Sequence, residues 1–242
     1  MRSTLTIAHR GGLSAAPENS LEAFEHAIAI GAEMIELDVR RSADGVLIVH
    51  HDPHVAGIPT ASLCAADIAL RLGRRPPTLA EALDLARGRI AVDVELKEDG
   101  CSEQALAQIR DRRLGPEEVV LTSFRDAVVR DCRQLAPELR AGLLLGARTD
   151  RPGAAGVSEL VLPAARLQRA DASFAAPHVA LTRLGVLKQI AAIGLPSVVW
   201  TVNSPRTLDA LYDDDRVEGI ITDRPELALA VRSERARASR AA

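Results

Sequence analysis

The segment MIELDV at residues 34–39 alternates apolar and acidic side chains, and the segment IAVDVEL at residues 90–96 repeats the pattern. Side chains alternate between the two faces of a β-strand, so Glu36 and Asp38 point to the same side, about 7 Å apart. By the same spacing Glu95 and Lys97 share one face, with Asp93 one step lower. Each segment is therefore predicted to be a strand that presents carboxylates on its inner face.

Further strand-like segments alternate with helix-like segments along the chain. We predict strands at residues 5–9, 34–39, 90–96, 119–123, 140–145, 172–176, 197–202 and 219–222, and helices at residues 21–30, 79–86, 102–113, 125–135, 182–193 and 205–212. Residues 153–170 are ambiguous: residues 158–162 could form a strand, but a broken helix fits the alternation better. Eight strands alternating with helices in 242 residues predict an α/β fold, the (β/α)₈ TIM barrel.

The limits of the domain follow from composition. The barrel is predicted to occupy residues 1–230, and the Arg-, Ser- and Ala-rich residues 231–242 are predicted to form a frayed helix or a disordered tail. Near the start, Asn19 is expected to cap a helix with Glu22 as its capping-box partner. Glu18, in the loop after the first strand, has two open interpretations, a ligating or orienting role and a plain loop contact.

Composition excludes several classes of protein. Aromatic residues make up 2% of the chain, so aliphatic residues and alanine must fill the core, and a net charge of −3 argues against nucleic-acid binding. Three widely spaced cysteines are typical of free thiols in a reducing compartment. With no apolar run of membrane-spanning length and no signal peptide before the first strand, we expect a cytoplasmic protein without a transmembrane segment. The sequence leaves the oligomeric state open.

Chemistry-bearing side chains gather where the first three predicted barrel strands end. His9 and Arg10 follow the first strand, and Glu36, Asp38, Glu95 and Lys97 stand at the ends of the next two. In a barrel of this type the site forms at the carboxyl ends of the strands. Carboxylates aimed into one space repel one another unless a proton or a cation lies between them. A hard divalent cation with oxygen ligands, beside histidines that can move protons, predicts metal-assisted phosphate-ester chemistry.

Eight short motifs occur in order along the chain: HRGG at residues 9–12, PENS at 17–20, ELDV at 36–39, DG at 44–45 with HD at 51–52, ELK at 95–97, LTSF at 121–124, WTVN at 200–203 and GIITDRP at 219–225. With these motifs the chain resembles the glycerophosphodiester phosphodiesterase family over nearly its whole length. The resemblance implies an enzyme that hydrolyses small-molecule glycerophosphodiesters to glycerol 3-phosphate and an alcohol.

The resemblance also implies roles for individual residues. Glu36, Asp38 and Glu95 would hold one divalent cation, Mg²⁺ or Ca²⁺, and Arg10 and Lys97 would bind the phosphodiester. His9 and His51 would be the acid–base pair. Apart from the resemblance, the position of Trp200 at the end of a predicted strand favours a wall of the substrate site over plain core packing. Asn203 and Asp223 are loop residues for which a structural interpretation is equally good.

Several alternatives stay open. His50 competes with His51, although the family pattern places its histidine directly before Asp52. The nucleophile could be water or a neighbouring glycerol hydroxyl that forms a cyclic phosphate. Residues 53–76 lack the Arg-Thr-Thr signature of the family and form a shortened insertion, which leaves substrate choice open. A lysophospholipase D-like phosphodiesterase and a non-catalytic phosphate-ester-binding barrel are the alternative functions.

Overall fold

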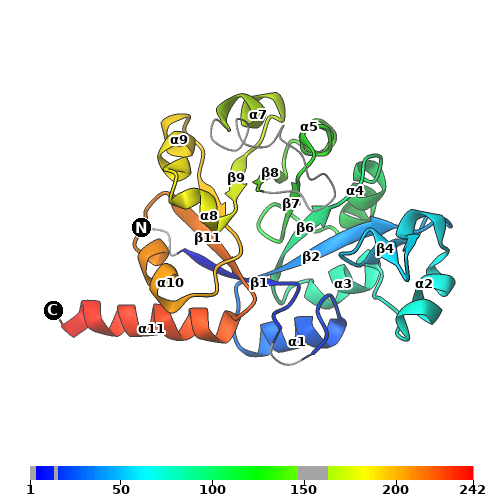
Figure 1. Cartoon of the computed structure of the whole chain (residues 1–242), viewed down its shortest axis with the longest axis horizontal. Coiled ribbons are helices and arrows are strands. Elements are labelled where there is room, and N and C mark those ends of the chain that lie inside the picture. Colours follow the sequence, from blue (N-terminus) through cyan, green and yellow to red (C-terminus); the bar gives the residue numbers. More distant parts are fainter. Residues whose placement is uncertain (1–3, 14–15, 147–162, 242) are drawn as a thin grey trace.

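The computed structural model describes residues 4–13, 16–146 and 163–241, and in this part of the chain parallel strands close into a barrel (Figure 1). Strand β1 pairs with β2 on one side and with β11 on the other, which closes the ring. The barrel strands are β1 (Leu5–His9), β2 (Met34–Arg41), β6 (Ala91–Leu96), β7 (Val119–Ser123), β8 (Arg140–Leu145), β9 (Phe174–Pro177), β10 (Ser197–Val199) and β11 (Val217–Thr222). The predicted TIM barrel is confirmed.

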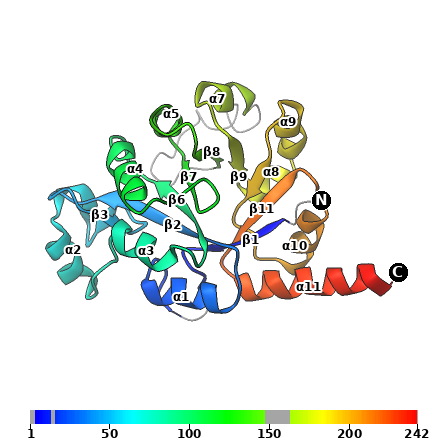
Figure 2. The same ribbon diagram turned by 180° about the vertical axis from the view of Figure 1, so that it is seen from behind.

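Helices surround the strands, as the two opposite views show (Figures 1 and 2). They are α1 (Leu21–Ala29), α3 (Leu79–Ala86), α4 (Ser102–Asp111), α5 (Asp126–Leu135), α7 (Ala164–Arg169), α8 (Val179–Thr182), α9 (Val186–Ala192), α10 (Pro205–Tyr212) and α11 (Pro225–Ala241). None of the helices within the described residues is both long enough and apolar enough to cross a membrane.

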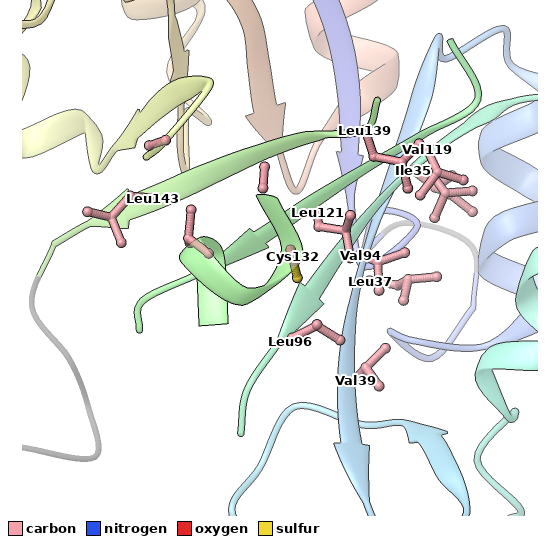
Figure 3. Packing of buried hydrophobic residues seen from close by; sticks show 14 of the residues in the cluster. Ile35, Leu37, Val39, Val94, Leu96, Val119, Leu121, Cys132, Leu139 and Leu143 are labelled. Atoms are coloured by element: carbon pink, nitrogen blue, oxygen red, sulfur yellow. The ribbon is translucent and has the colours of Figure 1, made fainter. Parts of the chain in front are cut away.

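The outer face of the strands forms the main core. Ile35, Leu37 and Val39 of β2 are fully buried, as are Val94 and Leu96 of β6, and they belong to one cluster with the helices outside (Figure 3). Burying such a side chain contributes about 1.5–3 kcal/mol. The period-two alternation therefore assigns one face of each strand to stability and leaves the other face to line the barrel interior.

The inner face changes character along the barrel axis. Its lower part is apolar and includes Ile7, Met34, Val120 and Phe174. Above this layer, the β2–β6 register places Glu36 opposite Asp93 and Asp38 opposite Glu95. The pairing of two acid-bearing strands therefore concentrates carboxylates at the carboxyl end of the barrel.

A small lobe between β2 and α3 was not anticipated as secondary structure. It contains β3 (Leu47–Val49), which runs antiparallel to β2, the two-stranded β4 (His54–Val55) and β5 (Ile58–Pro59), the 3₁₀ turn η1 (Thr60–Ser62) and α2 (Ala65–Leu72). Its own apolar cluster joins Ile48, Val55, Leu63 and Ile68. The lobe lies at one edge of the barrel (Figure 1), and its description as a shortened insertion stays a prediction.

Several predicted boundaries need correction. Strand β2 continues to Arg41, so Glu36 and Asp38 lie within the strand and not at its end. The helix predicted at residues 182–193 begins later, as α9 at Val186, because Gly185 adopts a left-handed conformation, and the short α8 ends at Thr182. Within the ambiguous residues 153–170, helix α7 forms, whereas the possible strand at 158–162 lies outside the described residues.

The start of α1 also differs from the prediction. Ser20, not Asn19, is the N-cap, and its hydroxyl accepts a hydrogen bond from the backbone N–H of Ala23. Asn19 adopts a left-handed backbone conformation instead, with φ of 55°, which asparagine tolerates better than most residues. At the other end α11 runs to Ala241, and the limit at residue 230 with a frayed or disordered tail beyond it stays a prediction.

Candidate active site

A cavity of about 280 Å³ opens at the carboxyl end of the barrel strands. Seven of the predicted site residues line it: His9, Arg10, Glu36, His51, Glu95, Lys97 and Trp200. Asp38 is fully buried directly beside Arg10 and Lys97. The structure therefore brings all eight predicted residues together from β1, β2, β6, the segment after β3, and the segment after β10.

Three carboxylates form the centre of the site. Glu36, Asp38 and Glu95 each place one oxygen within 4.8 Å of the others, and all three are buried. A cluster of this kind is costly to bury unless cations or protons compensate its charge. An all-oxygen donor set is the type that Mg²⁺ and Ca²⁺ prefer, so these residues fit a hard divalent cation.

The pKa values reflect the crowding of negative charge. Burial, together with Asp38, Glu95 and Asp93, holds the pKa of Glu36 well above its ordinary value. Burial also raises the pKa of Glu95, although Lys97 opposes the increase. One layer below, burial raises the pKa of Asp93 to about 7 against the hydrogen bond that it accepts from Thr122.

Two cations compensate part of this charge. Lys97 Nζ lies 2.7 Å from Asp38 Oδ1 and 2.6 Å from Glu95 Oε1, and Arg10 Nε lies 2.9 Å from Asp38 Oδ2. Burial alone would raise the pKa of Asp38, but Lys97 and Arg10 outweigh it and hold this carboxyl ionised. Arg10 also donates to both oxygens of Glu18, at 2.9 and 3.0 Å, which favours the orienting interpretation of Glu18.

His9 is held by a chain of polar side chains. Its Nδ1 lies 2.5 Å from Asp223 Oδ1, and its Nε2 lies 3.8 Å from Glu36 Oε2. Asn203 donates from its amide to the other oxygen of Asp223 at 2.6 Å. Burial opposes ionisation of Asp223, but the hydrogen bond and the charge of His9 lower the pKa of this carboxyl. Because Nδ1 is engaged, Nε2 is the His9 nitrogen available for proton transfer.

The two adjacent histidines that follow β3 have different surroundings. His51 lines the cavity, and its Nδ1 lies 2.8 Å from Asp52 Oδ1. Burial lowers the pKa of His51, partly offset by Asp38. His50 is 8% exposed, is absent from the described cavity lining, and its Nε2 has no hydrogen-bond partner among the described residues. The geometry therefore favours His51 over His50 as the histidine that faces a ligand.

The opposite side of the cavity is apolar. Trp200 and Phe124 meet edge to face with ring centroids 5.4 Å apart, and Leu144 and Ile221 continue the surface. The Trp200 indole N–H donates to the Ala176 carbonyl at 2.6 Å, so this side chain offers a ligand its ring and not a hydrogen bond. This wall suits carbon–hydrogen surface, whereas the β1–β2–β6 side suits anionic oxygen.

Two residues in the site were underestimated from sequence. Asn19 donates to Asp38 Oδ2 at 2.8 Å and accepts from the Asp38 backbone N–H at 3.3 Å, so it supports the carboxylate cluster and does not cap α1. Asp223 was predicted to be a loop residue, with a structural and a functional interpretation equally good, and its carboxylate contacts His9. The signal for Asp223 was barrel closure: β1 and β11 are neighbours, with Ala8 opposite Thr222, so the next residues of both strands meet.

Comparisons with known protein sequences point to one family. The model of the glycerophosphoryl diester phosphodiesterase family matches residues 9–227. A glycerophosphodiester phosphodiesterase of Caldanaerobacter subterraneus subsp. tengcongensis is 30% identical over 244 residues, which covers 92% of this chain and 95% of the relative.

Solved structures show the same architecture. A glycerophosphodiester phosphodiesterase of Agrobacterium tumefaciens superposes with a TM-score of 0.74 at 28% identity, covering 95% of this chain and 99% of that one. A phosphodiesterase of Oleispira antarctica, solved in complex with the product sn-glycerol-3-phosphate, has a TM-score of 0.77 at 21% identity, over 96% of this chain and 97% of that one. The resemblance inferred from the eight motifs is confirmed, and the chain belongs to the glycerophosphoryl diester phosphodiesterase family of enzymes.

Proposed function

We propose that this protein hydrolyses glycerophosphodiesters to glycerol 3-phosphate and an alcohol, with one divalent cation and two histidines. The observation that carries the proposal is the convergence of Glu36, Asp38 and Glu95 within 4.8 Å, beside a cavity that His9 and His51 line. Family membership supports the phosphodiester class. The product bound to the Oleispira relative supports glycerol 3-phosphate as the product here.

The three carboxylates would hold the cation, Mg²⁺ or Ca²⁺, since all their donor atoms are oxygen. When bound, this ion would supply positive charge for the phosphate oxygens. The raised pKa values of Glu36 and Glu95 support the assignment: burial is their main cause, Asp38 adds repulsion to both, and a bound cation would favour the ionised forms.

Arg10 and Lys97 would bind the non-bridging phosphate oxygens and stabilise the charge that builds as the attacking oxygen approaches phosphorus. Both cations are already fixed by Asp38, and Lys97 also by Glu95. Since their orientation is set before substrate arrives, little reorganisation is needed during the reaction.

His9 and His51 would divide the proton transfers. One removes a proton from the attacking oxygen, while the other protonates the alcohol oxygen as its bond to phosphorus breaks. If water attacks, glycerol 3-phosphate forms directly; if the adjacent glycerol hydroxyl attacks, a cyclic phosphate forms and water opens it in a second step. Asp223 holds Nδ1 of His9 and Asp52 holds Nδ1 of His51. In both rings Nε2 therefore remains for the substrate.

The test is a turnover assay of the purified protein with glycerophosphocholine, glycerophosphoethanolamine and a lysophospholipid. We expect glycerol 3-phosphate from the first two, loss of turnover in EDTA, and recovery with Mg²⁺ or Ca²⁺. Full turnover in excess chelator would contradict the metal assignment. Faster cleavage of the lysophospholipid would favour the lysophospholipase D-like alternative, and binding without any turnover would favour the non-catalytic barrel.

A readout independent of turnover is thermal stabilisation by the metal, since a ligand that binds only the folded state raises the melting temperature. Glu36→Gln should abolish that metal-dependent shift. Glu22→Gln is the matched control, because Glu22 is exposed on α1 and absent from the described cavity lining. A small-molecule diester is the proposed partner, and the cytoplasmic location remains a prediction.

A further inference from the structure

We propose that Arg40 is a positioning residue that fixes the segment carrying His51 against the segment that follows Glu95 and Lys97. The inference rests on the proposed catalytic role of His51. Arg40 directly follows the ELDV motif and lies outside all eight motifs.

Arg40 lies on β2 two positions after Asp38, so it shares the inner face with Glu36 and Asp38. Its side chain is 11% exposed and lines the cavity. Burying a guanidinium to this degree is costly unless its donors are satisfied. The partners of the guanidinium therefore indicate what this side chain does.

Two segments far apart in the sequence supply those partners. Arg40 Nε donates to the backbone carbonyl of His51 at 2.8 Å, and Nη1 donates to Glu98 Oε1 at 3.0 Å. The second oxygen of Glu98 accepts the backbone N–H of Arg41 at 3.2 Å. Glu98 directly follows Lys97, so one partly buried ion pair joins the His51 segment to the segment that carries the phosphate-binding lysine.

His51 needs such support more than His9 does. The carboxylate that holds the His51 ring, Asp52, is 68% exposed, and ion pairs of this kind contribute little. The partner of His9 is Asp223, whose side chain is 20% exposed and is itself held by Asn203. The position of His51 therefore depends on hydrogen bonds to the backbone. The His50 N–H donates to the Asp38 carbonyl at 2.9 Å, and the Arg40 guanidinium donates to the His51 carbonyl.

A positioning role predicts a specific kinetic pattern. A displacement of about 1 Å at a catalytic group can cost roughly 100-fold in rate, so Arg40→Gln should lower kcat about 10- to 100-fold. KM should stay within about twofold, because lost orientation affects the transition state and not ground-state binding. A direct contact of Arg40 with substrate would instead raise KM.

The deciding experiment combines Arg40→Gln with His51→Ala under single-turnover conditions, with enzyme in excess so that residual rates are measurable. If Arg40 acts through His51, the double variant should be within about threefold of His51→Ala alone, since groups that act as one unit are not additive. Arg41→Gln is the matched control: its guanidinium donates to the Gly100 carbonyl on the exposed surface, and kcat should be unchanged.

Each result decides between the possibilities. Unchanged kcat in Arg40→Gln, a rise in KM that accounts for the loss, or multiplication of the two single effects would overturn the inference while leaving the proposed function intact. Full activity of His51→Ala would refute the proposed role of His51 instead. If Arg40→Gln has a melting temperature well below that of the wild type, Glu98→Gln is the second variant. It removes the ion pair but keeps the hydrogen bond from Arg40 to His51, so a smaller loss of kcat is expected, again non-additive with His51→Ala.

Discussion

The two sides of the cavity are built from the same barrel but carry different chemistry. On the β1–β2–β6 side, His9 faces Glu36, and Lys97 forms ion pairs with Asp38 and Glu95. On the opposite side, Phe124, Leu144 and Trp200 offer carbon surface. The difference indicates that the residues that determine rate and those that determine selectivity come from separate strands. Substitutions on the charged side should reduce kcat, and substitutions on the apolar side should alter substrate preference.

The largest expected effect is loss of a proton-transfer group on the charged side. His9→Ala and His51→Ala should each lower kcat by roughly 10²- to 10⁴-fold, the usual range for a general acid or base. His50→Ala is the matched control and should cost far less, because His50 is buried away from the described cavity lining. Steady-state kinetics measures this, and a larger loss for His50 than for His51 would reverse their assignment.

A smaller effect is expected from the partner of His9. Asp223→Asn keeps the size of the side chain but removes the charge that holds the imidazole in its orientation, and kcat should fall about 100-fold. The comparable change at the exposed partner of His51, Asp52→Asn, should cost less than about tenfold because solvent screens that pair. Equal losses in the two variants would show that the burial of Asp223 is irrelevant to its role.

On the apolar side, Trp200→Ala should mainly change binding. Removing this ring takes away apolar surface that contacts the substrate, so KM should rise about tenfold with a smaller change in kcat. Discrimination among alcohol head groups should stay within about tenfold, since an open apolar wall distinguishes small groups weakly. Comparing kcat/KM across several head groups measures this, and strong selection for one head group in the wild type would contradict it.

The outer face of the same strands should affect stability alone. Leu37 lies between Glu36 and Asp38 in the sequence, but its side chain is on the outer face of β2, where it is fully buried in the main core. Leu37→Ala should lower the free energy of unfolding by about 2–5 kcal/mol through the cavity it creates. Denaturant titration measures this loss, while kcat per folded molecule should be unchanged. A large fall in kcat at full folding would show that the two faces are coupled.

The sequence predicted the barrel strands because each is a short apolar run that alternates with helix-like segments, a pattern that does not depend on distant neighbours. Strands β7 and β8 begin and end at the predicted residues. The small lobe was missed for the opposite reason: β4 and β5 have two residues each and are too short to show a period. Their place is set by packing of Val55 against Ile48, Leu63 and Ile68, which no local pattern reveals.

The carboxylate cluster was also predictable, since i and i+2 spacing fixes which side chains share a face. Asn19 shows the limit of such reasoning. An asparagine before a helix has a good local interpretation as a cap, yet Ser20 takes that position and Asn19 bonds to Asp38. The choice between adjacent residues is decided by a tertiary contact that spans 19 positions, and a local capping pattern cannot distinguish the two.

Closure of the barrel by β1 and β11 has a consequence during protein synthesis. His9 emerges from the ribosome early, but Asp223 is 214 positions later, and the two meet only when the last strand enters the ring. A nascent chain that already contains all three carboxylates still lacks the group that orients His9. The contact that holds His9 therefore forms only with completion of the fold, so partly synthesised chains would contain the three carboxylates before they contain the residue that holds His9.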